Sequence, residues 1–330
     1  MNYPPEYYFF DAHCHLQEPE IMWDIEGMMS RWHNNRGGTL VCCGTKESDW
    51  QAVANIASQY DNILPSFGVH PWFVENISEK WFDTLDRYLD TRFNNRTPFM
   101  GEIGLDHVLK DIDQEKQEII FKTQMGMAKE RKIPVSIHVR KGWDTFIKIL
   151  KHIGPLQEGG LIHSYSGSAD MVPLLEKHGL HISFSGSVTH PANKKVKKSL
   201  KAVSPHRLLI ETDSPAILPR YFTSKEFQSN DNCSKASYVP IHEIQSNNIT
   251  SQDFQSNNIC NEDVCIETDF ATIETDFTTK FVPSKKIYDM GWNEPCNILL
   301  VALAVSQILE TTLPKVAIQT AINGKELFHS

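Results

Sequence analysis

Short apolar segments alternate with longer amphipathic ones along most of this chain, and this alternation constrains the fold more than any other feature. The apolar segments are near-continuous runs rich in β-branched and aromatic residues, as expected for strands that are covered on both faces. They span Tyr8–Ala12, Thr39–Gly44, Ile63–Val69, Phe99–Ile103, Val135–His138, Gly160–His163, His181–Ser185 and Arg207–Glu211. Strands that alternate with helices in this way predict an α/β protein, a TIM-type (β/α)8 barrel, with an open doubly wound sheet as the competing fold.

Helical patterns fill the intervals between these strands. They cover Asp49–Tyr60, Ser78–Phe93, Gln114–Arg131, Trp143–His152, Met171–His178 and Ala192–Val203. The last part, Pro295–Phe328, is interpreted as two closing helices broken near Thr312–Pro314. One barrel accounts for a chain of 330 residues, so we expect residues 1–330 to form a single domain.

Residues 222–287 interrupt the alternation with a stretch rich in Ser, Asn, Thr, Gln and Asp. The stretch repeats itself, because Gln-Ser-Asn begins at residues 228, 245 and 255, and Ile-Glu-Thr-Asp-Phe begins at 266 and 273. Polar repeats of this kind cannot bury enough apolar surface to fold, so we expect a disordered insertion after the eighth strand. The tripeptide Glu211-Thr-Asp213 recurs twice in the insertion, but neither repeat is followed by Ser-Pro. We therefore assign metal binding to Asp213 and not to the repeats.

The formal net charge of −9 offers no general attraction to nucleic acid, so a phosphodiester ligand would need a local basic patch or bound metal. Lys194–Lys198 with Lys201 is a dense basic cluster, which is either a solvated helix face or a contact for a DNA backbone. The seven cysteines have no framework spacing and indicate a reducing compartment. No secretory or membrane-spanning pattern is present in the sequence, so we expect a cytoplasmic protein that does not enter a membrane.

Residues able to bind a metal ion stand where several of the predicted strands end. His13 and His15 follow the first strand, and because residues two apart in extended backbone share a face, both can converge on one ion. Further His, Glu and Asp residues end other strands: Glu102, Asp106, His138, His163, Glu211 and Asp213. In a barrel these ends surround one mouth, so the combination favours a metal site over scattered surface residues.

The sequence resembles the TatD family of metal-dependent deoxyribonucleases, a branch of the amidohydrolase superfamily. The matching motifs occur in the family's order: His13-Cys-His15, Gly68-Val-His-Pro71, Gly101-Glu-Ile-Gly-Leu-Asp106, His138-Val-Arg140, His163-Ser-Tyr-Ser-Gly167, Glu211-Thr-Asp-Ser-Pro215 and Asn293-Glu-Pro295. The resemblance implies two divalent metal ions per chain, Mg2+, Mn2+ or Zn2+. It places His13, His15 and Asp213 on one ion, His138 and His163 on the other, and Glu102 between them.

Roles in catalysis and substrate binding follow for a few of these residues. Glu102 and Asp213 are the predicted catalytic residues, and Asp213 can accept the proton of the attacking water. Arg140 shares the face of His138, so it is expected either to bind a phosphate or to form a salt bridge at the barrel end. By the resemblance, His70 and Tyr165 contact substrate, with packing as the alternative role.

The first functional hypothesis is a deoxyribonuclease, exonuclease-like, acting on single strands or ends of DNA by a two-metal activated water. The alternative is a hydrolase of the same superfamily that acts on a small ester, amide or phosphoester. A third hypothesis is a non-catalytic scaffold that binds partners through the insertion, although the sequence names no protein partner. The presence of all six predicted ligands favours catalysis. The other histidines, His181 among them, are interpreted as surface or helix-end residues.

Overall fold

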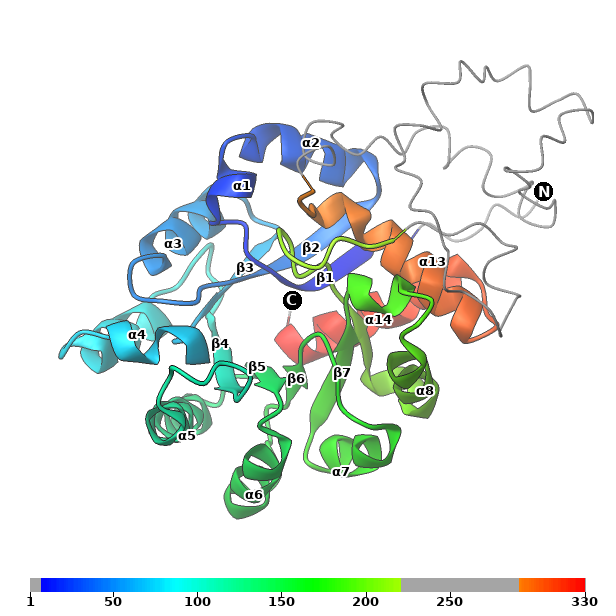
Figure 1. Cartoon of the computed structure of the whole chain (residues 1–330). Helices are drawn as coiled ribbons and strands as arrows, with labels where there is room; N and C mark the ends of the chain where they lie inside the picture. Colours follow the sequence, from blue (N-terminus) through cyan, green and yellow to red (C-terminus); the bar gives the residue numbers. More distant parts are fainter. Residues whose placement is uncertain (1–6, 221–290, 330) are drawn as a thin grey trace, which may run out of the picture.

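The computed structural model describes residues 7–220 and 291–329, which form a parallel β-barrel surrounded by helices (Figure 1). The predicted insertion at 222–287 lies outside the described residues. The strands are β1 (Phe9–Cys14), β2 (Gly37–Cys43), β3 (Ile63–Phe67), β4 (Phe99–Asp106), β5 (Val135–Arg140), β6 (Gly160–Ile162), β7 (Leu180–Phe184) and β8 (Leu208–Ile210). Each pairs in parallel with the next strand along the chain, in the order β1 to β8.

Backbone hydrogen bonds just beyond β8 join the last strand to the first. The N–H of Asp213 donates to the carbonyl of His13 at 2.9 Å, and the N–H of His15 donates to the carbonyl of Ser214 at 2.8 Å. These bonds bring the two ends of the sheet together at its C-terminal edge. The prediction of a TIM-type (β/α)8 barrel is confirmed, and the open sheet is not the fold of this chain.

The helices form a ring outside the strands (Figure 1). They are α1 (Pro19–Met22), α2 (Ile25–Asn34), α3 (Trp50–Gln59), α4 (Trp81–Asp90), α5 (Gln114–Arg131), α6 (Trp143–Ile153), α7 (Val172–Lys177), α8 (Lys194–Ala202), α13 (Ile298–Ile308) and α14 (Leu313–Phe328). The predicted helices are all found, and α5 has the predicted bounds. Helix α5 begins at Gln114 because Asp113 caps its first turn by accepting from the N–H groups of Glu115 and Lys116. Helices α1 and α2 were not predicted.

The inside of the barrel is filled by an apolar cluster that α14 closes at the N-terminal end of the strands. The ring of Phe328 stacks on Phe10 with centroids 5.9 Å apart and meets Phe99 edge-on at 4.8 Å. Gly324 allows this approach, because a Cβ at that position would overlap the Phe10 ring. In Figure 1 α14 lies across the centre of the barrel, behind the strands. The cluster comprises Phe10, Ala12, Val41, Cys43, Leu64, Phe99, Leu161, Leu209, Leu327 and Phe328.

His181 corrects one sequence prediction, because it lies in β7 and is only 6% exposed, not on the surface or at a helix end. Its Nδ1 lies 3.5 Å from Nη1 of Arg207. Burial lowers the pKa of His181 from 6.5 to about 4, and the charge of Arg207 lowers it further in the same direction. The imidazole is therefore neutral at pH 7.

In the part of the chain that the structure describes, no single helix is both long and apolar enough to cross a membrane. Pro295–Ile308 and Leu313–Phe328 meet the length and composition criteria only as a pair, and that pair is bent by 110°.

Candidate metal centre

Strand β4 carries Glu102 into the mouth of the barrel through an irregularity in its pairing with β5. Met100 pairs with Val135 and Ile103 with Ile137, so three steps along β4 match two along β5. Such a bulge redirects a side chain without ending the strand. Two residues on, Gly104 lets β4 approach β5 closely, because a Cβ there would collide with the carbonyl oxygen of His138.

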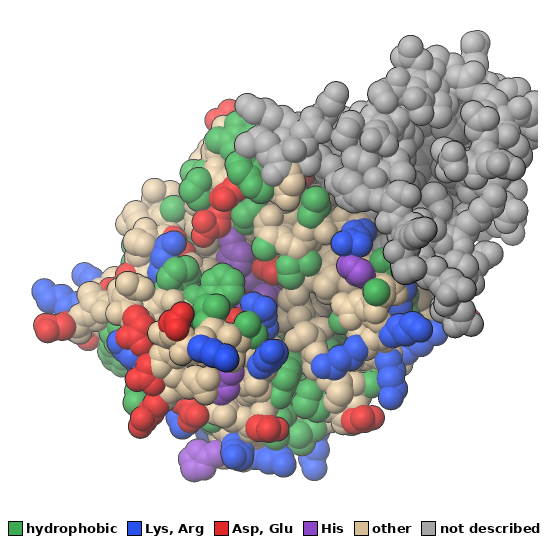
Figure 2. Space-filling view, in the orientation of Figure 1, with side chains coloured by type: hydrophobic (Ala, Val, Ile, Leu, Met, Phe, Trp, Pro, Cys, Tyr) green, Lys and Arg blue, Asp and Glu red, His purple; other side chains and the backbone are tan. Residues whose placement is uncertain are grey.

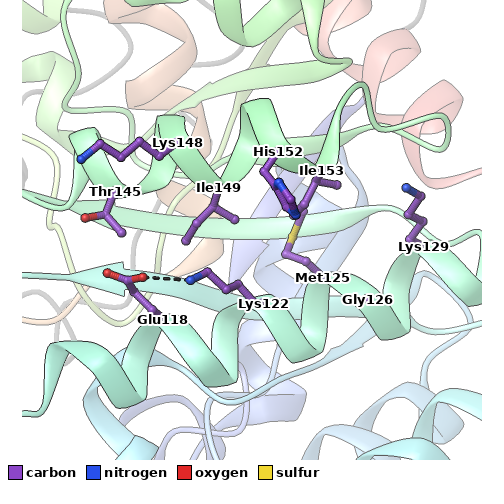
Figure 3. Close-up of a pocket in the computed structure, with 10 residues that line it drawn as sticks. All are labelled: Glu118, Lys122, Met125, Gly126, Lys129, Thr145, Lys148, Ile149, His152 and Ile153. Carbon is purple, nitrogen blue, oxygen red and sulfur yellow. Dashed lines mark hydrogen bonds and ion pairs between the residues drawn. The ribbon is translucent and has the colours of Figure 1, made fainter.

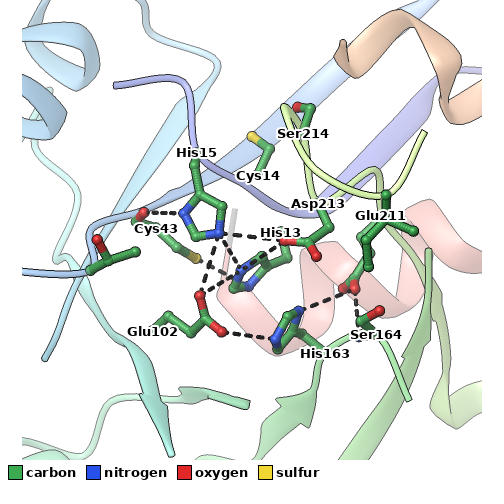
Figure 4. Close-up of polar contacts among 12 residues, drawn as sticks. His13, Cys14, His15, Cys43, Glu102, His163, Ser164, Glu211, Asp213 and Ser214 are labelled. Carbon is green, nitrogen blue, oxygen red and sulfur yellow. Dashed lines mark hydrogen bonds and ion pairs between the residues drawn. The ribbon is translucent and has the colours of Figure 1, made fainter. Parts of the chain in front are cut away.

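Glu102 lies between two pairs of histidines and faces each pair with a different oxygen. Figure 4 shows one of its oxygens directed at His13 and His15 and the other at His163. Its Oε2 is 3.4 Å from Nε2 of His13 and 3.4 Å from Nε2 of His15. Its Oε1 is 2.8 Å from Nε2 of His163 and 3.0 Å from Nδ1 of His138. The carboxyl is only 3% exposed, and burial alone would raise its pKa. Electrostatic attraction to the surrounding imidazoles, His163 first, and a hydrogen bond with His13 outweigh burial and hold the pKa of Glu102 well below 4.5, so it is anionic.

Asp213 follows β8, the last strand of the sheet, and lies beside His13 and His15. Its Oδ1 lies 3.4 Å from Nε2 of His15 and 3.8 Å from Nε2 of His13. Burial would raise the pKa of Asp213, but the hydrogen bond with His15 and the nearby imidazole charges lower it. The closure of β8 onto β1 thus brings an anionic carboxylate to two histidines that lie far from it in sequence.

The outer nitrogens of His15 and His138 meet groups that fix which nitrogen carries the proton. Nδ1 of His15 lies 2.7 Å from the Cys43 carbonyl, which can only accept, so Nδ1 carries a hydrogen and Nε2 is the nitrogen whose lone pair is available to a cation when the ring is neutral. Nε2 of His138 lies 3.1 Å from Oδ2 of Asp106, so Nδ1 of that ring faces the centre. Partners of this kind are typical of metal-binding histidines.

His13 and His163 are held in a similar way. Nδ1 of His13 lies 2.8 Å from the hydroxyl of Ser136, which leaves Nε2 directed at the carboxylates. Nδ1 of His163 lies 3.4 Å from Oε1 of Glu211, and that oxygen also accepts from the N–H of Ser164 at 2.5 Å. Figure 4 shows His163 between Glu211 on its outer side and Glu102 on its inner side.

These contacts leave electron-rich atoms facing one another at short range. Nε2 of His13 and Nε2 of His15 are 3.3 Å apart, and Nδ1 of His138 and Nε2 of His163 are 3.0 Å apart. Burial alone would lower the pKa values of His15, His138 and His163, but the carboxylates beside them raise all three. The cluster therefore attracts positive charge, and its histidine and carboxylate donors fit a divalent cation. The six predicted ligands lie together here: His13, His15, Glu102, His138, His163 and Asp213.

His70 also reaches this cluster, but its protonation differs from that of the other histidines. Its Nδ1 accepts from the N–H of Trp72 at 3.2 Å, so its Nε2 carries the hydrogen and points at Oε1 of Glu102 from 3.3 Å. Burial lowers its pKa to about 4, which keeps the ring neutral. His70 is therefore arranged to donate a hydrogen bond to Glu102, and its contact with substrate stays a prediction.

Arg140 and Tyr165, the other predicted substrate contacts, lie in different surroundings. Nη1 of Arg140 is 3.5 Å from Oδ2 of Asp106, and its side chain is 48% exposed, so it reaches solvent at the mouth. Tyr165 is 1% exposed, and its hydroxyl donates to the Ser168 carbonyl at 2.8 Å, as the packing alternative requires. A direct role for either residue in substrate binding stays a prediction.

Sequence reasoning did not give a role to several residues that support the cluster. Asp106 and Glu211 stood inside recognised motifs, and their position at strand ends was the available signal. Ser136 and Trp72 carried no signal, because nothing in their spacing relates them to His13 or Asp106.

A groove of about 840 Å3 between α5 and α6 lies away from this cluster, on the outer helix layer (Figure 3). Lysines and a histidine line it, and Glu118 pairs with Lys122 at 3.0 Å. None of the six predicted ligands borders the groove. At the mouth itself, Figure 2 shows histidine side chains at the centre of the face, with Lys and Arg gathered more densely over α6 to α8.

A buried group of histidines and carboxylates at the C-terminal mouth of an α/β barrel fits a metal-dependent enzyme, and the family match identifies that enzyme as a metal-dependent hydrolase. The family model described as TatD related DNase matches residues 10–329, and the chain belongs to this family.

Named relatives and a solved structure agree with this assignment. The chain is 30% identical over 219 residues to the uncharacterized metal-dependent hydrolase YabD of Bacillus subtilis, a match covering 66% of this chain and 84% of YabD. It is 28% identical over 213 residues to the 3′-5′ ssDNA/RNA exonuclease TatD of Erwinia tasmaniensis, covering 64% and 81% of the two chains. The crystal structure of the TatD homologue YjjV of Escherichia coli shares the fold, with a TM-score of 0.73, 21% identity and 98% of each chain covered.

Proposed function

We propose that this protein is a deoxyribonuclease that cleaves DNA phosphodiester bonds, as an exonuclease on single strands or ends, with two divalent cations. The observation that carries the proposal is the position of Glu102, whose two oxygens face two separate histidine pairs. One carboxylate shared between two sets of donors is the arrangement that a two-cation site needs. A relative named as an ssDNA/RNA exonuclease supports nucleic acid as the substrate class.

The proposed ligand sets divide the cluster in two. His13, His15 and Asp213 would hold one ion, His138 and His163 the other, and Glu102 would contact both. If bound there, a pair of ions (Mg2+, Mn2+ or Zn2+) would acidify water and neutralise charge on a phosphoryl oxygen.

The remaining chemistry belongs to the side chains. The Asp213 carboxylate, deprotonated because its pKa is lowered, accepts the proton of the attacking water at a carboxylate oxygen. His70 donates from Nε2 to Oε1 of Glu102 and holds that carboxylate in place. The exposed guanidinium of Arg140 binds a non-bridging phosphate oxygen, because its planar N–H donors match the oxygens of a phosphate.

The test is degradation of end-labelled single- and double-stranded DNA by purified protein with Mg2+, Mn2+ or Zn2+, beside a Glu102→Ala variant. The expected result is metal-dependent cleavage that the substitution abolishes, with the labelled products giving the direction of digestion. If the protein binds two ions per chain yet cleaves no DNA with any of the three metals, DNA is not the substrate.

A small ester, amide or phosphoester is the second candidate substrate, and the net charge of −9 favours it over a long polyanion. A panel of p-nitrophenyl esters and phosphoesters, assayed under the same metal conditions, would distinguish the two. A non-catalytic scaffold is the weaker third proposal, because all the predicted ligands converge.

We also propose that the protein acts in the cytoplasm in DNA catabolism. Among the described residues, Cys14, Cys42, Cys43 and Cys296 are free and buried, which supports a reducing compartment.

A further inference from the structure

Trp72 is an aromatic side chain at the mouth that stays exposed although it touches the metal centre. It is the second residue of the short helix η1 (Pro71–Asn76) after β3, and 41% of its surface is accessible. Its indole ring lies 5.0 Å from the His70 ring at 90°, and 6.4 Å from the His138 ring at 70°, measured between centroids. Exposure alone does not set Trp72 apart, because Phe82 is exposed to the same extent. What distinguishes Trp72 is that its ring lies beside the rings of His70 and His138 at the mouth.

The orientation of this indole is fixed by one hydrogen bond. Nε1 of Trp72 donates to Oδ2 of Asp106 at 2.7 Å, and Asp106 is fully buried. The N–H edge is therefore turned inward, and the orientation of the ring plane is fixed while 41% of the residue stays exposed. A flat surface held in this way can receive a planar group with little further loss of entropy.

Arg140 shares the same carboxylate oxygen. Its Nη1 lies 3.5 Å from Oδ2 of Asp106, with 48% of the side chain exposed. A planar ring and a guanidinium thus stand side by side at the mouth, both anchored on Asp106, which also contacts the predicted ligand His138. A planar base and an adjacent phosphate are the two groups that this pair would recognise together.

We propose that Trp72 is the stacking platform for the unpaired nucleobase next to the scissile phosphodiester, and that Arg140 binds the phosphate of the same nucleotide. This inference rests on the proposed function and extends it to specificity. A base must leave its duplex partner to stack on the indole, so the arrangement selects single strands and frayed ends.

The test compares a short oligothymidylate with a matched oligonucleotide whose terminal residues lack their bases. Trp72→Ala is expected to raise KM for the oligothymidylate roughly tenfold, with little change for the abasic substrate. Trp72→Phe keeps an aromatic face but loses the N–H, so it should retain most of the affinity for bases. Phe82→Ala is the matched control, because Phe82 is a comparably exposed aromatic (42%) on α4.

Equal losses on both substrates in Trp72→Ala and Trp72→Phe would overturn the inference, since the indole would then act only by holding Asp106. Unchanged KM in Trp72→Ala, with DNA still cleaved, would also overturn it while leaving the proposed function intact. A protein that cleaves no DNA could still bind it. Fluorescence anisotropy therefore measures the binding of both oligonucleotides to the metal-loaded protein. Base-dependent binding that needs Trp72, without any cleavage, would support base stacking on the indole but reject the nuclease, whereas binding that does not depend on the bases would overturn the inference.

Discussion

The two ends of the barrel are built from the same strands but bury opposite kinds of side chain. At the N-terminal end, Phe10, Phe99 and Phe328 pack together under α14. At the C-terminal mouth, the buried groups are imidazoles and carboxylates such as Glu102, which is 3% exposed. Burial stabilises the aromatic rings but penalises the charged groups, so only the first end contributes directly to the stability of the fold.

This difference shows how the barrel separates stability from chemistry. The closed end needs nothing beyond its own packing, whereas the mouth depends on hydrogen bonds to outer partners such as Asp106 and on positive charge between its donors. Substitutions at one end should therefore change the free energy of unfolding, and those at the other should change metal affinity. Four measurements test that separation.

The largest effect is expected from Phe328→Ala at the closed end. Removing a ring that is 2% exposed leaves a cavity beside Phe10 and Phe99, at a cost of about 3–5 kcal/mol in the free energy of unfolding. Denaturant unfolding measures this loss, with the 42% exposed Phe82→Ala as the control of small effect. Metal affinity of the folded variant should stay at the wild-type value, and a large loss of that affinity would contradict the separation of the two ends.

The pH dependence of stability should reveal the neutral His181 at the start of β7. Its folded pKa of about 4 lies below the unfolded value of 6.5, so the unfolded state binds more protons between these values. The free energy of unfolding is therefore full above pH 6.5 and falls as the pH drops towards 4, by up to about 3 kcal/mol from this group.

His181→Gln cannot titrate, so its stability should fall less over the same interval than that of the wild type. Denaturant titrations of both proteins at pH 4.5, 5.5 and 7, spanning roughly the window set by the shift, measure the difference. Parallel curves for the two proteins would mean that the pKa of His181 is not lowered in the folded state.

Metal binding at the mouth should raise the free energy of unfolding, whereas no such effect is expected from the closed end. A divalent ion at about 100 times its Kd is expected to raise the free energy of unfolding by about 2.7 kcal/mol. Thermal unfolding with and without a chelator measures this metal-dependent gain in stability. The gain should be the same for the wild type and for Phe328→Ala. Glu102→Gln keeps the side-chain shape without the charge, and a full metal-dependent gain in that variant would exclude Glu102 as a ligand.

Asp106→Asn should give the smallest effect, because Asp106 acts through His138. Loss of the carboxylate beside Nε2 of His138 is expected to weaken metal affinity about 10–100-fold, with a small change in unfolding by denaturant. Isothermal titration with Mn2+ or Zn2+ gives the affinity, and Glu75→Gln, an exposed carboxylate paired with Lys116, is the control. Equal affinities in both variants would show that Asp106 does not support the metal site.

The sequence by itself determined the number of strands and the candidate ligands, whereas the choice of a closed barrel over an open sheet needed the bonds that join β8 to β1. Near-continuous apolar runs are a local property, so β1 to β8 could be recognised one at a time. The strand ends offered eight candidate ligands, and the resemblance to the TatD family reduced them to six. Helices α1 and α2 escaped prediction, and His181 was misplaced, because the pattern of one segment does not show what covers it.

Only the tertiary structure decided how these residues act. The inward nitrogen of His15 is set by the Cys43 carbonyl, and Asp106 joins Trp72 and Arg140 to His138. Each of these contacts joins residues from different strands or loops, so it exists only after the barrel closes. Protonation and orientation depend on the partners and the burial of a group, and these arise from the packing of the whole chain.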